Sequence, residues 1–211
     1  MKTSFLPLLV VAAFAATCLG QTTPAEESKT ITKDERDRAI AYLKETQQEF
    51  VTAVDGLTEA QWKFKASPER WSIAETAEHI ALTEDRIWKM VNGKMMKSPP
   101  TPEKRAEAAG KDEMILKAIP DRSTKVQAPE QLQPTGKWET PAAIVQDFQK
   151  TRAQEISYLA ETQEDLRSHF EEHPLLKTMD AYQWLLLNGA HGKRHTAQII
   201  EVKADPNFPK S

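Results

Sequence analysis

Two histidines near the C-terminal end of the sequence, His191 and His195, lie four positions apart in the stretch LNGAHGKRHTAQIIEV. Side chains with this spacing stand one above the other on a helix, and neutral imidazole is a common nitrogen ligand of divalent metals. Such a pair can hold one cation. The spacing is also compatible with a second interpretation, in which one histidine caps a buried carbonyl and the other is solvated.

The neighbours of this pair favour a position at the protein core. Trp184 and Leu187 fall in the same helical sector as His191 and His195, because each residue turns the helix by about 100°. A third imidazole, His79, flanks the apolar face of another predicted helix. Helix bundles build metal sites from facing helices, so these three histidines are candidate metal ligands. The alternative, three separate histidines at the rim of the core, stays open at this point.

The remaining histidines, His169 and His173, also have H-x-x-x-H spacing. Pro174 disfavours a helical conformation at His173, so we interpret this glutamate-rich segment as a solvated connector. The stretch HGKRH carries no glutamate after its first histidine and therefore lacks the general base of a zincin protease. Cys18 is the only cysteine in the sequence, which excludes a structural zinc site built from several thiolates.

Start signals for four long amphipathic helices are present along the chain. They are the capping pairs Thr32–Glu35, Ser72–Glu75 and Asp180–Gln183, and a proline at the first helical turn in Thr140–Pro141. Between 97 and 138 a proline-rich crossover is predicted, with one short helix near 114–119. No segment has convincing strand alternation. We therefore predict an all-α four-helix bundle with a long crossover between its second and third helices.

Composition and the N-terminus limit the possible partners. The net charge of −3, with acids and bases interspersed, gives no basic stripe and argues against nucleic-acid binding. Residues 1–20 resemble a signal peptide cleaved after Gly20, since their apolar run is shorter than the roughly 20 residues of a stable membrane span. A lipoprotein anchored at Cys18 is the alternative. We expect an exported, periplasmic or extracellular protein with a flexible tether (21–31), one domain (32–205) and a tail (206–211).

Two stretches, RWSIAETAEHI and HPLLKTMDAYQWLLLNGAHGKRHTAQI, together with the predicted order of helices, resemble the DinB-like (DinB/YfiT-like) superfamily of metal-binding four-helix bundles. The resemblance covers about residues 33–204. It implies an up-down-down-up topology, a homodimer, and a divalent metal, commonly zinc or nickel, bound by His79, His191 and His195. Lys177 departs from the pattern, because a glycine commonly follows the His-Pro segment in that superfamily.

The resemblance also implies a range of functions. Three imidazoles leave open positions on the ion for water or a small-molecule substrate, which is typical of a catalytic site. We therefore expect a metal-dependent hydrolase or transferase, and some relatives transfer small thiols such as bacillithiol or mycothiol. The alternative is a non-catalytic binding module that is metal-stabilised or metal-free. Glu75, Arg194 and Gln198 are candidates to surround the ligands, and Trp71 and Trp184 are expected to be core anchors.

Overall fold

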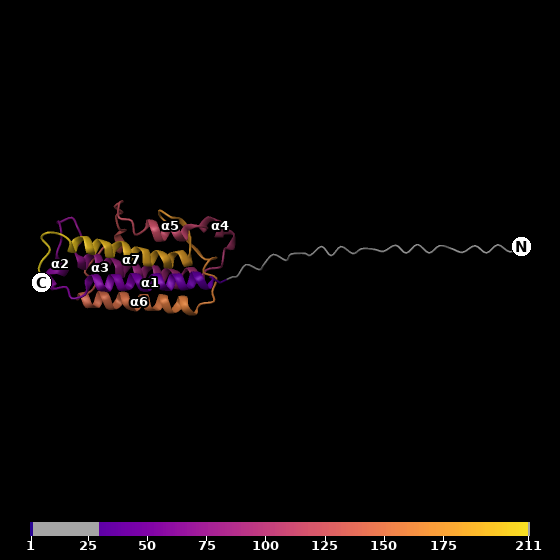
Figure 1. Ribbon diagram of the computed structural model, residues 1–211, viewed down its shortest axis with the longest axis horizontal. Coiled ribbons are helices and arrows are strands. Elements are labelled where there is room, and N and C mark those ends of the chain that lie inside the picture. Colours follow the sequence, from indigo (N-terminus) through magenta and orange to yellow (C-terminus); the bar gives the residue numbers. More distant parts are fainter. Residues whose placement is uncertain (2–29, 211) are drawn as a thin grey trace.

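Four long helices lie side by side in the computed structural model, which describes Met1 and residues 30–210 (Figure 1). The predicted signal peptide and most of the predicted tether fall outside the described residues. The four helices confirm the predicted bundle architecture. Their bounds are Lys33–Val54 for α1, Ile73–Gly93 for α3, Pro141–Glu161 for α6 and Ala181–Lys203 for α7.

Each long helix begins where its sequence signal predicts. Thr32, Ser72 and Asp180 are the N-caps of α1, α3 and α7, and each forms a reciprocal capping box with the residue three positions later. The Thr140 side chain caps α6, whose first residue is Pro141. These contacts satisfy backbone N–H groups that have no partner within the helix, so the sequence fixes the helix starts locally.

Contacts between helix ends set the direction of each helix. The Tyr182 hydroxyl donates to the carbonyl of Glu35, which brings the N-terminal ends of α7 and α1 together. Arg36 donates to the carbonyls of Leu159 and Thr162, so the start of α1 meets the end of α6. The start of α3 lies beside the C-terminal half of α7, because Arg70, just before α3, pairs with Glu201 and His79 packs against His195. Helices α1 and α7 therefore run one way, and α3 and α6 run the other way.

The crossover between α3 and α6 is more structured than the sequence predicts. The expected helix near 114–119 is present as α5, and α5 packs along α7. A short helix α2 also follows α1, where Thr58 and Gln61 form a fourth capping box. The minor elements are α2 (Glu59–Lys63), η1 (Met95–Lys97), η2 (Pro102–Lys104), α4 (Arg105–Ala108), α5 (Lys111–Ala118) and η3 (Glu130–Leu132).

The prediction that the chain contains no strand is wrong. Strands β1 (Phe170–His173) and β2 (Lys177–Asp180) form an antiparallel hairpin immediately before α7. Four-residue strands are too short for an alternating pattern to stand out from chance. The hairpin also brings Lys177 to a φ of 61°, the left-handed conformation that glycine adopts without steric cost. This conformation explains why a glycine would suit the position.

A polar layer divides the apolar core into two clusters. One cluster contains Leu43, Ile87 and Leu159, and the other contains Phe50 and Phe148. Between these positions along the helices lie side chains that are polar yet at least 99% buried. They are Thr46 on α1, Glu84 on α3, Arg152 and Glu155 on α6, and Asn188 on α7.

Arg152 is the centre of this polar layer. Its guanidinium donates two hydrogen bonds to the carboxylate of Glu84, one to the Leu43 carbonyl and one to the Thr46 hydroxyl. Burial and the nearby Glu84 carboxylate raise the pKa of Glu155 well above its usual value. The layer thus sets one guanidinium against two carboxyl groups: Glu84 forms the bidentate pair with Arg152, and Glu155 lies 3.6 Å from the same guanidinium.

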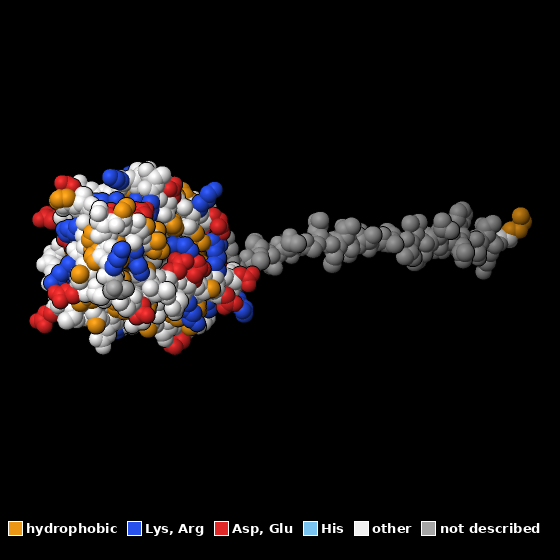
Figure 2. Space-filling model, turned by 60° about the vertical axis from the view of Figure 1, so that its left-hand side comes forward, with side chains coloured by type: hydrophobic (Ala, Val, Ile, Leu, Met, Phe, Trp, Pro, Cys, Tyr) orange, Lys and Arg blue, Asp and Glu red, His pale blue; other side chains and the backbone are white. Residues whose placement is uncertain are grey.

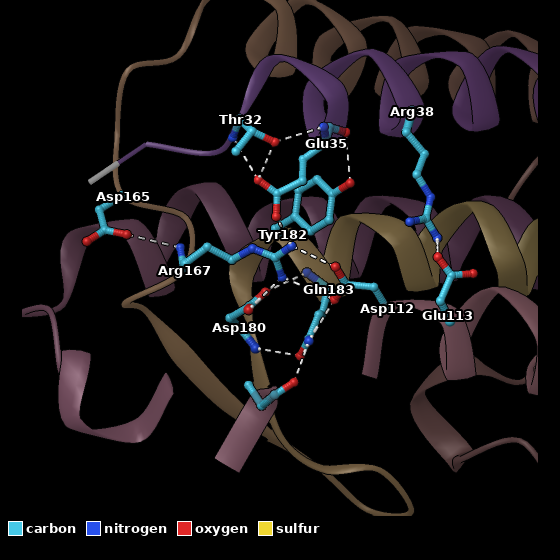
Figure 3. A network of polar contacts seen from close by, with 11 residues as sticks. Thr32, Glu35, Arg38, Asp112, Glu113, Asp165, Arg167, Asp180, Tyr182 and Gln183 are labelled. Carbon is cyan, nitrogen blue, oxygen red and sulfur yellow. Dashed lines mark hydrogen bonds and ion pairs between the residues drawn. The ribbon is translucent and has the colours of Figure 1, made fainter. Parts of the chain in front are cut away.

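A second polar network closes the end of the bundle where α1 and α7 begin (Figure 3). Arg167, in the loop before β1, forms ion pairs with Glu35 of α1, Asp112 of α5 and Asp180 at the start of α7. Its guanidinium also lies 4.1 Å from the centre of the Tyr182 ring. This single side chain therefore ties the crossover to two long helices.

The face of the molecule in Figure 2 has no large patch of a single charge, because acidic and basic side chains are interspersed across it. This distribution agrees with the absence of a basic stripe in the sequence. Within the part of the chain that the structure describes, none of the helices combines the length and apolar character that a bilayer crossing requires.

The C-terminal segment packs back onto the domain. Phe208 lies edge-on against Phe64, in the connector between α2 and α3, with 5.4 Å between the ring centres.

Replacing Lys177 with glycine should raise the free energy of unfolding by about 0.5–1 kcal/mol. Glycine removes the steric cost of a positive φ, and the greater flexibility of glycine in the unfolded chain offsets only part of this gain. Lys177→Ala is the control, since alanine keeps the Cβ that causes the cost. Urea denaturation of the three proteins measures both effects. Equal stabilisation by glycine and alanine would contradict the backbone explanation.

Replacing Arg152 with methionine should lower the free energy of unfolding by about 3–5 kcal/mol, because the Glu84 carboxylate stays buried without its partner. The double variant Arg152→Met/Glu84→Leu should lose far less than the sum of the two single variants, since both charges leave together. Chemical denaturation of the four proteins gives the coupling energy. Additive losses would mean that the two charges do not depend on each other.

Candidate metal centre

The structure brings His79, His191 and His195 together at the contact between α3 and α7. One potential ligand atom from each lies within 4.8 Å of the other two. The Nε2 atoms of His79 and His191 are 3.1 Å apart, and the three ring centres are separated by 4.5–4.9 Å. Within the described residues, this is the only group of three or more histidine, cysteine or acidic side chains with such geometry.

The positions of the three rings follow from the helices that carry them. The capping box at Ser72 fixes the start of α3, and His79 follows about two turns later. On α7, His191 and His195 share the face on which Trp184 and Leu187 are buried. Because α3 and α7 are antiparallel neighbours, His79 meets the C-terminal half of α7. His79 is 3% exposed, whereas the two α7 histidines remain partly accessible.

Two of the imidazoles are held by carbonyl oxygens on their far side. The Nδ1–H of His79 donates to the carbonyl of Leu132 at 2.7 Å, and the Nδ1–H of His195 donates to Oε1 of Gln198 at 3.0 Å. A neutral imidazole carries one proton, so each of these hydrogen bonds leaves a lone pair on Nε2. Metal-binding histidines are usually oriented in this way by an oxygen acceptor.

The electrostatics of the cluster favour neutral rings. Burial lowers the pKa of His191 well below its usual value, and the neighbouring rings of His195 and His79 lower it further. Burial and His79 lower the pKa of His195 to about 3, and burial also lowers the pKa of His79. All three imidazoles are therefore uncharged near pH 7, which is the form that binds metal.

The donor set fits a divalent cation. In a tetrahedral zinc site with Zn–N distances of about 2.0–2.1 Å, two nitrogen ligands are separated by about 3.3 Å. The Nε2 atoms of His79 and His191 are 3.1 Å apart. Two lone pairs at this distance repel each other unless a proton or a cation lies between them. Three neutral imidazoles suit zinc, nickel and related ions better than the hard cations magnesium or calcium.

The crossover forms one wall of the site. The sequence did not predict which of its residues contact the histidines. Leu132 lies in η3, and its carbonyl is the acceptor for His79. Arg122 donates to Oε1 of Gln198, which also accepts from His195, and forms a bidentate pair with Glu201. A backbone carbonyl has no signal in residue type, so only the folded structure reveals the role of Leu132.

The three residues proposed to surround the ligands occupy different places. Gln198 contacts His195 directly. Arg194 turns toward the crossover, where it donates to the carbonyls of Ile119, Asp121 and Thr124. Glu75 caps the start of α3 and pairs with Lys65.

The aromatic and remaining histidine side chains complete the surroundings. Trp184 is 7% exposed, as expected for a core anchor, but Trp71 is partly exposed and its ring centre lies 4.9 Å from that of His79. His173 packs against Trp184 at the tip of β1, and its Nδ1 accepts from two backbone N–H groups of the hairpin turn. His169 is buried beside Ser98, so it does not lie in a solvated connector. Neither His169 nor His173 belongs to the three-histidine cluster.

A sequence profile of the DinB superfamily matches residues 42–199, a range that contains all three histidines. The chain belongs to the DinB superfamily. This result confirms the resemblance inferred from the two sequence stretches around the histidines.

Individual relatives of this DinB-superfamily chain agree with the assignment. The chain is 26% identical over 164 residues to YuaE, an uncharacterized protein of Bacillus subtilis (strain 168), and the match covers 78% of this chain and 96% of YuaE. The fold is similar to that of YfiT from Bacillus subtilis, described as a probable metal-dependent hydrolase with an unusual four-helix bundle topology. That match has a TM-score of 0.54 and 17% identity, and covers 90% of this chain and 97% of YfiT.

Replacing Arg194 with methionine should loosen the crossover wall, because three carbonyls lose a charged donor. Trypsin cleavage after Arg122 and Lys125 should accelerate at least about tenfold, since losing one such bond of about 1.5 kcal/mol raises the open population by that factor. Lys193→Met is the matched control, because Lys193 pairs with Glu45 and Glu49 on α1. Equal acceleration in both variants would contradict a specific role of Arg194.

Proposed function

We propose that this DinB-superfamily protein is an exported metal-dependent hydrolase in which His79, His191 and His195 bind one divalent cation, zinc or nickel. The observation that carries the proposal is the convergence of three neutral imidazoles, two of which have carbonyl acceptors on Nδ1 and so direct Nε2 to a common centre. Histidines that bind a metal usually have such an acceptor on the other ring nitrogen, so these two contacts support a metal centre.

The chain's own residues would divide the tasks as follows. Leu132 and Gln198 hold the Nδ1 protons and fix the ring orientations. The accessible sides of His191 and His195 leave room for a small molecule, and the partly exposed ring of Trp71 offers an apolar surface beside His79. A divalent cation held by the three histidines would supply Lewis acidity, which can polarise a substrate carbonyl and lower the pKa of a nearby water.

Hydrolysis is favoured over the other candidate activities for one reason. YfiT, whose fold is similar over nearly its whole length, is described as a probable metal-dependent hydrolase. No contact in the described residues points to a thiol cofactor, so transfer of small thiols has no comparable support. The rival to any activity is a bundle in which the metal only stabilises the fold, and it predicts metal binding without turnover.

Export and self-association are further parts of the proposal. Export rests on the sequence of residues 1–20, and a homodimer rests on the superfamily resemblance. A chain that folds outside the cytoplasm would have to take its metal there, which is compatible with a site made only of histidine ligands and no thiolate.

Purified protein without a tag should contain about one equivalent of zinc or nickel by elemental analysis, and His191→Ala should lose it. A chelator should lower the free energy of unfolding of the native protein by about 2.7 kcal/mol if the metal was present at 100 times its Kd. His169→Gln is the control, because it removes an imidazole outside the cluster. A native protein with no metal and no response to chelator would contradict the proposal.

The same preparation distinguishes catalysis from stabilisation. Ester and amide substrates should be hydrolysed by the metal-loaded protein, and neither the chelated protein nor His191→Ala should turn them over. Metal content with no hydrolysis of any substrate in the screen would favour the stabilising role.

A further inference from the structure

The residue next to His79 on α3, Glu78, is bound to the crossover by an unusually complete set of hydrogen bonds. Glu78 is 5% exposed, and within the described residues its carboxylate forms no ion pair with a basic side chain. Instead it accepts from the backbone N–H groups of Thr135 (2.8 Å), Gly136 (3.0 Å) and Lys137 (3.1 Å), and from the Thr135 hydroxyl (3.3 Å).

Three consecutive N–H groups that converge on one anion form a backbone nest. Gly136 has a φ of 76°, which lets the chain turn so that its neighbours' N–H groups point the same way. The ammonium of Lys137 lies over the Trp138 ring, 4.2 Å from its centre, and so leaves the carboxylate to the backbone. The contact therefore fixes the path of the crossover backbone.

The crossover makes a second contact with α3 only three residues earlier. The Leu132 carbonyl accepts the Nδ1–H of His79 at 2.7 Å. Gln133, with extended φ and ψ of −72° and 145°, and Pro134, with its restricted ring, are the only residues between this carbonyl and the nest. Because three residues span at most about 10 Å, a nest held by Glu78 restricts where the Leu132 carbonyl can lie.

We infer that Glu78 is a positioning residue for the metal centre. Its carboxylate holds the crossover backbone, the backbone places the Leu132 carbonyl, and this carbonyl keeps the proton of His79 on Nδ1 so that Nε2 faces His191. The part of this inference that concerns metal affinity rests on the proposed function. The part that concerns the orientation and tautomer of His79 does not.

The first experiment uses the full metal-free protein and compares Glu78→Gln with the native chain. Nitrogen NMR of the imidazoles should report His79 mainly as the Nδ1–H tautomer in the native protein and as a mixture in the variant. Amide hydrogen exchange at 135–137 should be faster in the variant. An unchanged tautomer in a variant whose crossover amides have lost protection would overturn the inference.

The second experiment measures metal affinity by titration with Zn²⁺ and Co²⁺. Glu78→Gln should bind either ion about 10–100-fold more weakly, the usual loss when an outer partner of a histidine ligand is removed. The Co²⁺ absorption spectrum should also change, because the ring of His79 is less well oriented. Affinity and spectrum equal to those of the native protein would overturn the inference.

Glu75→Gln is the matched control. It removes the same charge from the same helix three residues earlier, and glutamine preserves the capping box with Ser72. Weaker binding in both variants to the same degree would mean that negative charge on α3, rather than the crossover contact, determines the affinity. We expect the control to bind like the native protein.

The inference remains testable if the Glu78 variant does not fold or if the native protein binds no metal. If Glu78→Gln does not fold, Gly136→Ala disturbs the same nest from the crossover side, since an added Cβ there meets no atom within 4 Å and only the backbone is strained. It should shift the tautomer and the affinity in the same direction, and a native-like result would overturn the inference. If the native protein binds no metal, the proposed function fails, and the tautomer measurement still decides the role of Glu78.

Discussion

A guanidinium in the middle of the bundle constrains the arrangement of all four long helices. Arg152 has no contact with solvent, so its charge must be met by Glu84 and its remaining N–H groups by carbonyl and hydroxyl oxygens of α1. A buried charge tolerates little displacement of its partners. Glu84 lies five residues after His79, and Asn188, which binds the Glu84 carbonyl, lies three residues before His191. The polar layer thus sets the register of α3 against α7 in which the histidines meet.

The sequence predicts the four long helices well because their start signals are local. A capping box involves residues three positions apart and needs no knowledge of the fold. The hairpin before α7 was missed because strands of four residues leave no periodic pattern, and the left-handed conformation of Lys177 gives no signal in a residue with a Cβ. The role of Arg152 was also invisible, since an arginine on an amphipathic helix is usually at the surface.

In the candidate site, too, local spacing predicts some residues, and only the folded structure reveals the others. The spacing of His191 and His195 indicates a shared helix face. His79 became a candidate from its place beside the apolar face of its helix, and the superfamily resemblance then implied all three as ligands, but no local pattern shows that α3 meets α7. The hydrogen-bond partners of the imidazole rings differ in the same way. Gln198 could be named from its helical spacing, three residues after His195, but a carbonyl in η3 and a nest at 135–137 depend on the path of the crossover.

The distance along the chain between the facing rings has a consequence for assembly. His79 and His191 are 112 residues apart, and the crossover, α6 and the hairpin all lie between them. A nascent or unfolded chain offers a cation only histidines that are neighbours in sequence, since the loop that must close before His79 reaches His191 is most of the domain. Tight binding of an ion at the proposed site would therefore follow folding, and the ions present where the bundle closes would determine which one it acquires.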